Sequence, residues 1–301
     1  MSTTCQVYLA CMALRIETQN WFLVAKPYQG LLILGIYLMF ILKWGPRWMK
    51  NRPPFKMDNV LIAYNAIQAI ICAILFWGWG GTYRWVCEPV DFTNSEDGLL
   101  KANMAYCYFL LKVFDLLDTV FFVLRKKFNQ VSFLHVYHHT GMVLRLFAAY
   151  LFGGHGSLVG VVNCFVHIVM YTYYLLTITM PAIKNMIWVK KFITQLQIIQ
   201  FFIFVVHMSV IIFKPDCQYP RWSAAVFLPQ NIFMLILFID FYIKTYVKKP
   251  KDKKPQEENN NETCKKNNDT KILNRHDDIR MTEQNLDGLK ARKSDNNHGD
   301  R

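Results

Sequence analysis

Seven apolar runs, separated by short polar segments, organise the first 247 residues of the chain. They occupy residues 30–43, 59–80, 103–124, 132–151, 157–177, 191–213 and 226–247. A helix needs about 20 mostly apolar residues to cross a bilayer. Six of the runs reach that length, and the first is short. The pattern predicts an all-α, polytopic membrane protein with seven transmembrane helices.

The composition changes at residue 248. Residues 248–301 contain no tryptophan, tyrosine or phenylalanine and are rich in Asn, Asp, Lys and Glu. Such a segment cannot bury enough apolar surface to offset the entropy lost when it is ordered. We therefore expect a disordered cytosolic tail at 248–301, a seven-helix transmembrane domain at 29–247 and a non-cytosolic amino-terminal segment at 1–28.

Basic residues alternate between the connecting segments. The segments after the first, third, fifth and seventh runs are basic, whereas those between them are poorer in Lys and Arg. By the positive-inside rule, the basic segments and the tail are cytosolic and the amino terminus lies on the far side. The formal net charge of +13 is thus explained by membrane topology, and no nucleic-acid partner is expected.

Two of the eight cysteines, Cys87 and Cys217, fall in loops between apolar runs that are predicted to be non-cytosolic. Cysteines on the oxidising side of an endomembrane often form disulfides. The sequence leaves two alternatives open, a disulfide between Cys87 and Cys217 or two free thiols.

Four of the runs carry clusters of polar residues, which are rare in membrane spans and usually functional. The clusters are Lys112, Asp115, Asp118 and Thr119; His135, His138 and His139; Asn163, His167, Tyr171 and Tyr174; and Thr194, Gln197 and Gln200. The spacing within each cluster places its members on one helical face. The four stripes are expected to face one another around an enclosed cavity in the cytosolic half of the membrane.

Each cluster also has a structural explanation. Asp115 could serve only to neutralise Lys112, one turn away. Arg145, seven residues after His138, could pair with Asp115 or with Asp118. The glutamines could be interhelical hydrogen-bonding groups. Three imidazoles on one face of a span are harder to explain as packing.

The HxxHH pattern at 135–139 allows two kinds of chemistry. Membrane desaturases and hydroxylases bind two irons with several histidine boxes, but only five of the eight histidines here lie in the apolar runs. A single zinc on His135, His139 and His167 stays open. The second kind is acyl transfer, because a neutral imidazole attacks thioesters, a second imidazole can act as base and amide donors can stabilise an oxyanion. A tunnel with an apolar lining would suit an acyl tail.

Basic residues at the cytosolic mouth of that tunnel would suit the phosphates of coenzyme A. They are Arg125, Lys126, Lys127, Lys190 and Lys191. A non-enzymatic transporter is a further alternative, but it would need polar residues that continue across the whole membrane. Here they become sparse beyond Lys112, Asn163 and His207, which favours a blind tunnel.

The blocks LKVFDLLDT, HVYHH, NCFVHIVMYTYY and TQLQIIQ, in this order, resemble the signatures of the very-long-chain fatty acid elongases (ELO family, 3-oxoacyl-CoA synthases). The resemblance covers residues 25–247. One departure is visible, since the first block of that family usually reads K-x-x-E-x-x-D-T and Asp115 stands here in place of glutamate. The carboxy terminus, NHGDR, also lacks the usual dilysine retrieval signal.

The resemblance implies an acyltransferase that condenses a long-chain acyl-CoA with malonyl-CoA to 3-oxoacyl-CoA, CO2 and CoA, without cofactor or metal. It implies seven helices, six of them enclosing an acyl tunnel, in the endoplasmic reticulum membrane, with a lumenal amino terminus and a cytosolic carboxy terminus. The other enzymes of the elongation cycle are expected partners, and a homodimer is allowed. The preferred chain length depends on the side chains that close the tunnel.

The resemblance also implies roles for residues. His138 would be the nucleophile that forms an acyl-imidazole, and His135 and His139 would orient it. His167 and Asn163 would contact the second substrate. The residues that would order the site are Lys112, Asp115 and Asp118. The residues that would bind substrate are Thr194, Gln197, Gln200, Tyr171 and Tyr174.

Overall fold

The computed structural model describes residues 21–23, 25–80, 87, 95–152, 157–217, 219 and 221–248. The chain divides into two units, Met1–Val247 and Lys248–Arg301. Apart from Lys248, the predicted disordered tail lies outside the described residues, as does most of the predicted segment 1–28. The account below therefore concerns the first unit.

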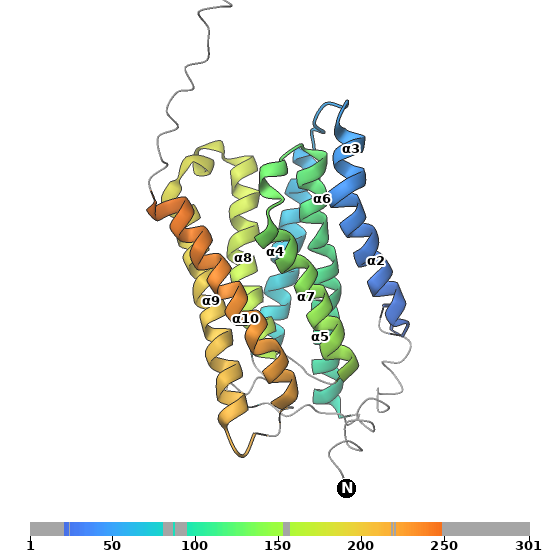
Figure 1. Ribbon diagram of the computed structural model, residues 1–301, viewed down its shortest axis with the longest axis vertical. Coiled ribbons are helices and arrows are strands. Elements are labelled where there is room, and N and C mark those ends of the chain that lie inside the picture. The colour runs from blue at the N-terminus through green and yellow to red at the C-terminus, as the bar shows by residue number, and fades with distance from the viewer. Residues whose placement is uncertain are drawn as a thin grey trace, which may run out of the picture. The chain divides into compact units, whose positions relative to one another are not determined.

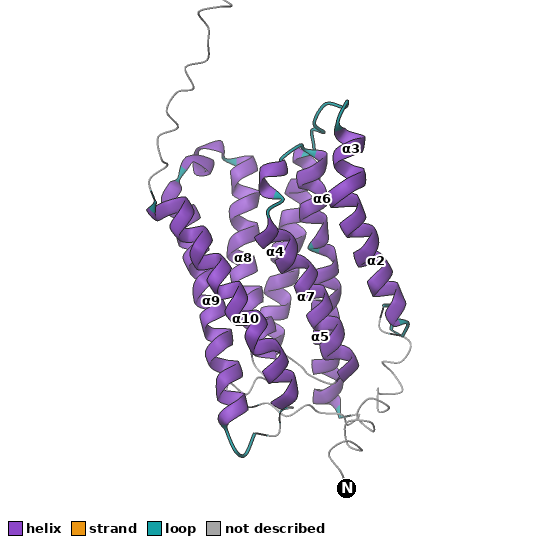
Figure 2. Ribbon diagram, in the orientation of Figure 1, coloured by secondary structure: helices purple, strands orange, loops and turns teal. Residues whose placement is uncertain are grey.

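The described residues of this unit are helical, and they contain no strand (Figure 2). The α-helices are α2 (Pro27–Met39), α3 (Gly45–Met49), α4 (Asp58–Gly80), α5 (Glu96–Phe114), α6 (Leu116–Leu124), α7 (Phe133–Phe152), α8 (Ser157–Thr179), α9 (Ile187–Phe213) and α10 (Arg221–Tyr242). All seven predicted apolar runs coincide with helix. The all-α prediction is confirmed for this part of the chain.

Among the residues that the structure describes, five helical segments are long and apolar enough to span a bilayer, judged by length and composition. They are Tyr28–Met49, Asp58–Trp79, Leu158–Thr179, Ile187–Phe213 and Ser223–Val247. The predicted runs 103–124 and 132–151 are also helical, but they are not among these five segments. The first is divided at Asp115 into α5 and α6, and the second carries the three neighbouring histidines. The structure thus supports a multi-pass membrane protein.

The first apolar run is longer than predicted. A π-helical turn, Phe40–Trp44, connects α2 to α3, so that the helical segment Tyr28–Met49 has 22 residues. Pro46 does not end it, because this proline falls in the first turn of α3, where a missing N–H is tolerated. The sequence pattern predicts too short a run because the charged residues Lys43 and Arg47 lie near the end of the helical segment.

Six helical segments follow one another in a closed circuit. In contact order they are α4, α5–α6, α7, α10, α9 and α8, and α8 returns to α4. The segment α2–α3 packs outside this circuit against α6. In Figure 1 the ends of α3, α6, α8 and α10 lie at the same end of the unit. The basic segments that follow these helices therefore share one end, as the predicted topology requires.

The most extensive helix contacts are those of α4 with α8 and of α9 with α10. Gly160 on α8 lets the Trp79 ring of α4 approach closely, because a Cβ at residue 160 would overlap that ring. Between α9 and α10, Phe201 and Phe238 stack with ring centroids 5.2 Å apart. These contacts hold the circuit together on the side opposite α2.

Cys87, which follows α4, and Cys217, which follows α9, form a disulfide with their Cα atoms 5.7 Å apart. Of the two alternatives left open by the sequence, the structure has the bonded one. The bond ties two segments separated by 130 residues at the end of the unit opposite the basic loops.

Candidate functional site

A buried ion pair lies where α5 meets α8. The Lys112 Nζ donates to Asp115 Oδ2 at 2.8 Å, and both side chains are almost fully buried. The same ammonium lies 3.2 Å from His167 Nδ1. Because an ammonium can only donate, Nδ1 accepts and the neutral ring carries its proton on Nε2. His167 is thereby arranged as a hydrogen-bond donor at its free nitrogen.

The second carboxylate oxygen of Asp115 is also satisfied. Asp115 Oδ1 accepts from Gln68 Nε2 of α4 at 2.7 Å and from the Tyr171 hydroxyl of α8 at 3.0 Å. The Tyr171 hydroxyl lies 3.1 Å from Asp118 Oδ2 as well, although its single proton serves one carboxylate at a time. Buried charges are tolerated when they are paired and hydrogen-bonded. Asp115 therefore does more than neutralise Lys112.

A chain of amides and a phenol links α5, α8 and α9. The Tyr108 hydroxyl donates to Asn163 Oδ1 at 2.8 Å, and Asn163 Nδ2 donates to Gln200 Oε1 at 3.4 Å. Tyr108 fixes the orientation of the Asn163 amide. The Gln200 oxygen is engaged, which leaves the Gln200 Nε2 group as a potential donor.

His135 belongs to a separate hydrogen-bonded chain. The Tyr37 hydroxyl of α2 donates to Thr119 Oγ1 at 2.8 Å, and Thr119 Oγ1 lies 3.0 Å from His135 Nε2. Since Thr119 Oγ1 accepts the hydrogen bond from Tyr37, its own hydroxyl hydrogen is available to His135 Nε2, an arrangement in which His135 carries its ring proton on Nδ1. The orientation of His135 is set by α2 and α6.

The other two histidines of the trio lie in aromatic surroundings. The His139 ring centroid is 4.3 Å from that of His135 and 5.4 Å from that of His138. The His138 ring also meets Phe201 and Phe238 edge-on, at 5.9 and 6.3 Å. Among the described residues, His138 has no hydrogen-bond partner on its ring nitrogens. The three imidazoles thus form one contiguous group.

The remaining predicted binding residues on α8 and α9 do not take part in the hydrogen-bonded chains described above. Gln197 Nε2 lies 3.9 Å from the sulfur of Met170. Thr194 Oγ1 donates to the Lys190 carbonyl at 3.0 Å and lies 3.5 Å from the Tyr246 hydroxyl. Tyr174 packs edge-on against Tyr171 and is 39% exposed. The structure brings none of these three to the Asp115 ion pair.

The predicted basic residues differ in their contacts. Arg125 lies 3.5 Å from Asp58, Lys126 donates to the Lys50 carbonyl at 3.3 Å, and Lys191 lies over the Tyr242 ring. Lys127 and Lys190 are exposed. These side chains border the common end of the helices, and their proposed contact with phosphates stays a prediction.

The suggested pairing of Arg145 with Asp115 or Asp118 is wrong for the described residues. The guanidinium instead lies 4.8 Å above the Phe227 ring of α10, and neither carboxylate is within ion-pair distance of it. A straight helix drifts by about 20° over seven residues, and a long side chain can then reach a different neighbour. Arg145 is therefore not part of the ion-pair cluster.

The metal alternatives can be compared with the same geometry. Within the described part of the chain, no group of three or more His, Cys, Asp and Glu side chains is arranged to hold a metal ion. His167 Nδ1 is engaged by Lys112, and a positive ammonium is a poor neighbour for a metal cation. The expectation of a metal-free site stays a prediction.

Sequence reasoning missed several residues that complete these networks. Gln68 is 2% exposed and contacts Asp115 directly, and Tyr37 and Tyr108 orient Thr119 and Asn163. The signal for Gln68 was present, because an amide inside an apolar run is conspicuous. The two tyrosines carried no such signal among the 15 tyrosines of the chain.

Comparison with known proteins identifies the family of this chain. The model of the GNS1/SUR4 family (ELO) matches residues 22–254. Very long chain fatty acid elongase 4 of Homo sapiens is 40% identical over 246 residues, covering 79% of this chain and 77% of the human protein. Very long chain fatty acid elongase 7 of Drosophila melanogaster is 38% identical over 245 residues, covering 79% and 74%. Elongase 7 of Rattus norvegicus is 36% identical over 253 residues, covering 81% and 90%. The chain therefore belongs to the GNS1/SUR4 family, which includes these very long chain fatty acid elongases.

Proposed function

We propose that this chain is a condensing enzyme of fatty acid elongation that joins a long-chain acyl-CoA to malonyl-CoA. One observation carries the mechanism. Within the contiguous imidazole group, neither His138 nor His139 has a hydrogen-bond partner on its ring nitrogens among the described residues, whereas His135 and His167 are each held at one nitrogen. His139 is buried, at 7% exposed, and His138 is only half-buried, so His138 is the more accessible of the two. A nucleophile needs a free lone pair, and His138 has one.

The first step is acyl transfer to the enzyme. A lone pair of the neutral His138 ring attacks the thioester carbonyl, the new N–C bond forms, and the C–S bond breaks with CoA as the leaving group. The proton that His138 loses goes to the CoA sulfur, so free CoA thiol and acyl-imidazole result. Donors beside the thioester would stabilise the developing oxyanion, and His167 Nε2 is suitably protonated for this role.

The second step forms the carbon–carbon bond. Malonyl-CoA loses CO2, and the electron pair of the broken bond becomes an enolate. The enolate carbon attacks the acyl carbon, and the N–C bond to His138 breaks with its electron pair going to the ring nitrogen. The resulting imidazolide takes up one proton from solvent, which restores neutral His138 as 3-oxoacyl-CoA leaves. The Asn163 and Gln200 amides are the proposed hydrogen-bond donors to the second substrate.

The closed circuit of six helical segments supports the proposal of an acyl tunnel inside it, with α2–α3 as a seventh span outside. The alternation of basic and less basic ends supports a cytosolic carboxy terminus and loading from the cytosol. Residence in the endoplasmic reticulum, the basic residues as CoA-phosphate contacts and the other elongation-cycle enzymes as partners belong to the same proposal.

The test uses purified full-length protein with a panel of long-chain acyl-CoAs and ¹³C-malonyl-CoA. We expect 3-oxoacyl-CoA two carbons longer than the acceptor, dependent on malonyl-CoA and insensitive to iron chelation. His138→Ala should abolish product, whereas Leu144→Ala on the exposed face of the same helix should retain it. Activity lost on chelation, or full turnover by His138→Ala, would refute the proposal and its mechanism respectively.

A further inference from the structure

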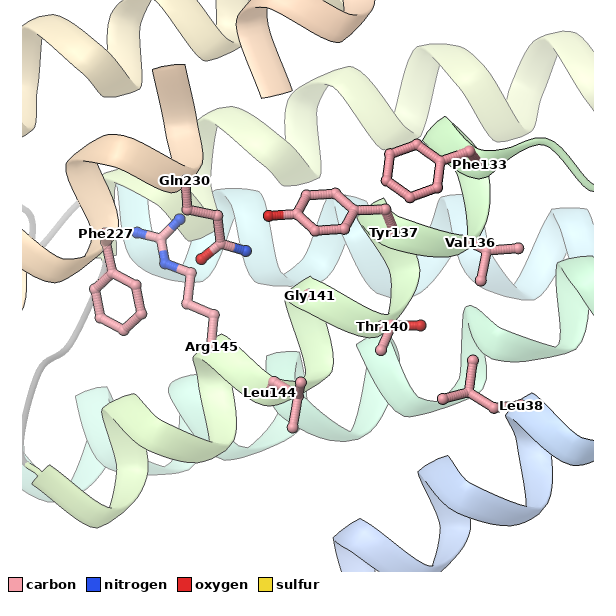
Figure 3. A pocket seen from close by; sticks show the side chains of 10 residues that line it. All are labelled: Leu38, Phe133, Val136, Tyr137, Thr140, Gly141, Leu144, Arg145, Phe227 and Gln230. Atoms are coloured by element: carbon pink, nitrogen blue, oxygen red, sulfur yellow. The ribbon is translucent and has the colours of Figure 1, made fainter. Parts of the chain in front are cut away.

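A groove runs along α7, mostly on the face that points away from the histidines. Its volume is about 490 Å³, and α7, α10 and Leu38 of α2 border it (Figure 3). Sites for small molecules range over about 300–1,000 Å³. The lining is mainly apolar, with Phe133 near one end and Phe227 near the other. The groove is therefore large enough for a lipid chain and chemically suited to one.

One lining residue does not fit an apolar groove. Arg145 is only 7% exposed, and the single contact of its guanidinium is with the Phe227 ring face at 4.8 Å. Among the described residues, no carboxylate lies within ion-pair distance of it. A buried charge is costly unless it is paired and hydrogen-bonded, and a ring face replaces an anion only in part. Within the part of the chain that the structure describes, Arg145 is thus a buried cation without a paired anion.

A second donor accompanies it. The Gln230 side chain of α10 lines the same groove and extends over Gly141 of α7 (Figure 3). A Cβ at residue 141 would lie 2.8 Å from Gln230 Nε2, so the glycine is what allows the amide to lie there. A guanidinium and an amide at one end of an apolar groove provide several N–H donors and no negative charge.

The side chains that line the groove indicate which kind of ligand it would bind. A guanidinium binds a carboxylate through two parallel hydrogen bonds, and the single cation balances a single negative charge. From Arg145 to Phe133 the groove follows about 18 Å of helix, which suits one extended acyl chain. A phospholipid would add a second acyl chain and a larger head group, whereas the lining offers one cation, Arg145, and otherwise only the neutral polar side chains of Gln230, Tyr137 and Thr140.

We propose that the groove between α7 and α10 binds a long-chain fatty acid anion, with its carboxylate on Arg145 and Gln230 and its chain extended towards Phe133. Most of the lining that α7 contributes, from Phe133 to Leu144, lies on the face turned away from His135, His138 and His139, whereas Arg145 lies two turns beyond His138 at the far end of the groove. This site does not depend on the proposed condensation reaction.

Photolabelling of the full-length protein tests this site. The protein is placed in phosphatidylcholine nanodiscs with a diazirine-bearing stearic acid, and the labelled peptides are mapped. We expect label on α7 and α10 around the groove, competition by oleate and no competition by methyl oleate, which has no charge. Arg145→Gln should weaken oleate competition about tenfold or more, and Arg145→Lys should retain part of it.

Gly141→Leu provides a second, charge-neutral variant that fills the groove and displaces only the flexible end of Gln230. It should lose the label as well, and it decides the question if Arg145→Gln does not fold. Equal competition by methyl oleate, unchanged labelling of the folded variants, tighter competition by phosphatidic acid or label confined to other helices would each overturn the proposal. Condensation activity, assayed in parallel, reports separately on the proposed function.

Discussion

The buried pair Lys112–Asp115 makes a quantitative prediction for Asp115→Asn. This change keeps the size of the side chain and removes its charge. It leaves a Lys112 ammonium that is 2% exposed without its counter-ion, and it disturbs the acceptor of Gln68 and Tyr171. Breaking a buried ion pair from one side costs about 3–5 kcal/mol.

For a chain of this size, 1 kcal/mol corresponds to a change in Tm of about 2–4 °C, so that Asp115→Asn should lower Tm by about 6–20 °C. The measurement is thermal unfolding of the detergent-solubilised protein, followed by tryptophan fluorescence. Asp58→Asn is the matched control, because its carboxylate is 65% exposed and lies 3.5 Å from Arg125. An exposed pair contributes about 1 kcal/mol or less.

Asp115→Glu tests whether charge or shape matters. It keeps the carboxylate and adds one methylene, and overpacking of a tight site costs about 1–3 kcal/mol, so its Tm should fall less than that of Asp115→Asn. A Tm for Asp115→Asn within the range of the Asp58→Asn control would refute the reasoning, because the buried ammonium would then not depend on Asp115.

Three further predictions address the imidazole group, the helix packing and the disulfide. Thr119→Val removes the link to His135, which should cost about 1–3 kcal/mol of stability and lower kcat more than it raises KM; wild-type kinetics would count against it. Gly160→Ala should lower stability by about 1–3 kcal/mol through overlap with Trp79, whereas Gly35→Ala, which has open space around it, should change stability by less; equal melting curves would contradict this. Serine replacement of either disulfide cysteine should cost about 2–5 kcal/mol, and replacing both should cost no more than replacing one, as measured by thermal unfolding without reductant.

The helical segments could be predicted because apolar stretches of membrane length leave few alternatives. Their ends could not be predicted in the same way. The run 103–124 begins at Glu96 in the structure, since the Ser95 side chain accepts from the Gly98 N–H at 3.1 Å and starts α5 early. N-cap residues of this kind extend a helix into polar sequence, where hydropathy gives no signal.

The ion-pair cluster could also be anticipated in part. Lys112, Asp115 and His167 stand out because charged and imidazole groups are expensive in an apolar span. Their pairing depends on how helices meet in space, so neither the Gln68 contact nor the choice of His167 nitrogen follows from spacing. Arg145 illustrates the same limit, because the seven-residue spacing suggested Asp115 or Asp118 as its partner and the structure places it over the Phe227 ring.

An acyl-enzyme trapping experiment tests the central claim most directly. Full-length protein is incubated with a long-chain acyl-CoA in the absence of malonyl-CoA, quenched, digested and analysed by mass spectrometry. We predict an acyl adduct on His138 that is absent in His138→Ala and that a chase with malonyl-CoA converts to 3-oxoacyl-CoA. An adduct instead on Cys164, a buried free thiol of α8, or 3-oxoacyl-CoA formed by His138→Ala at the wild-type rate, would contradict the account.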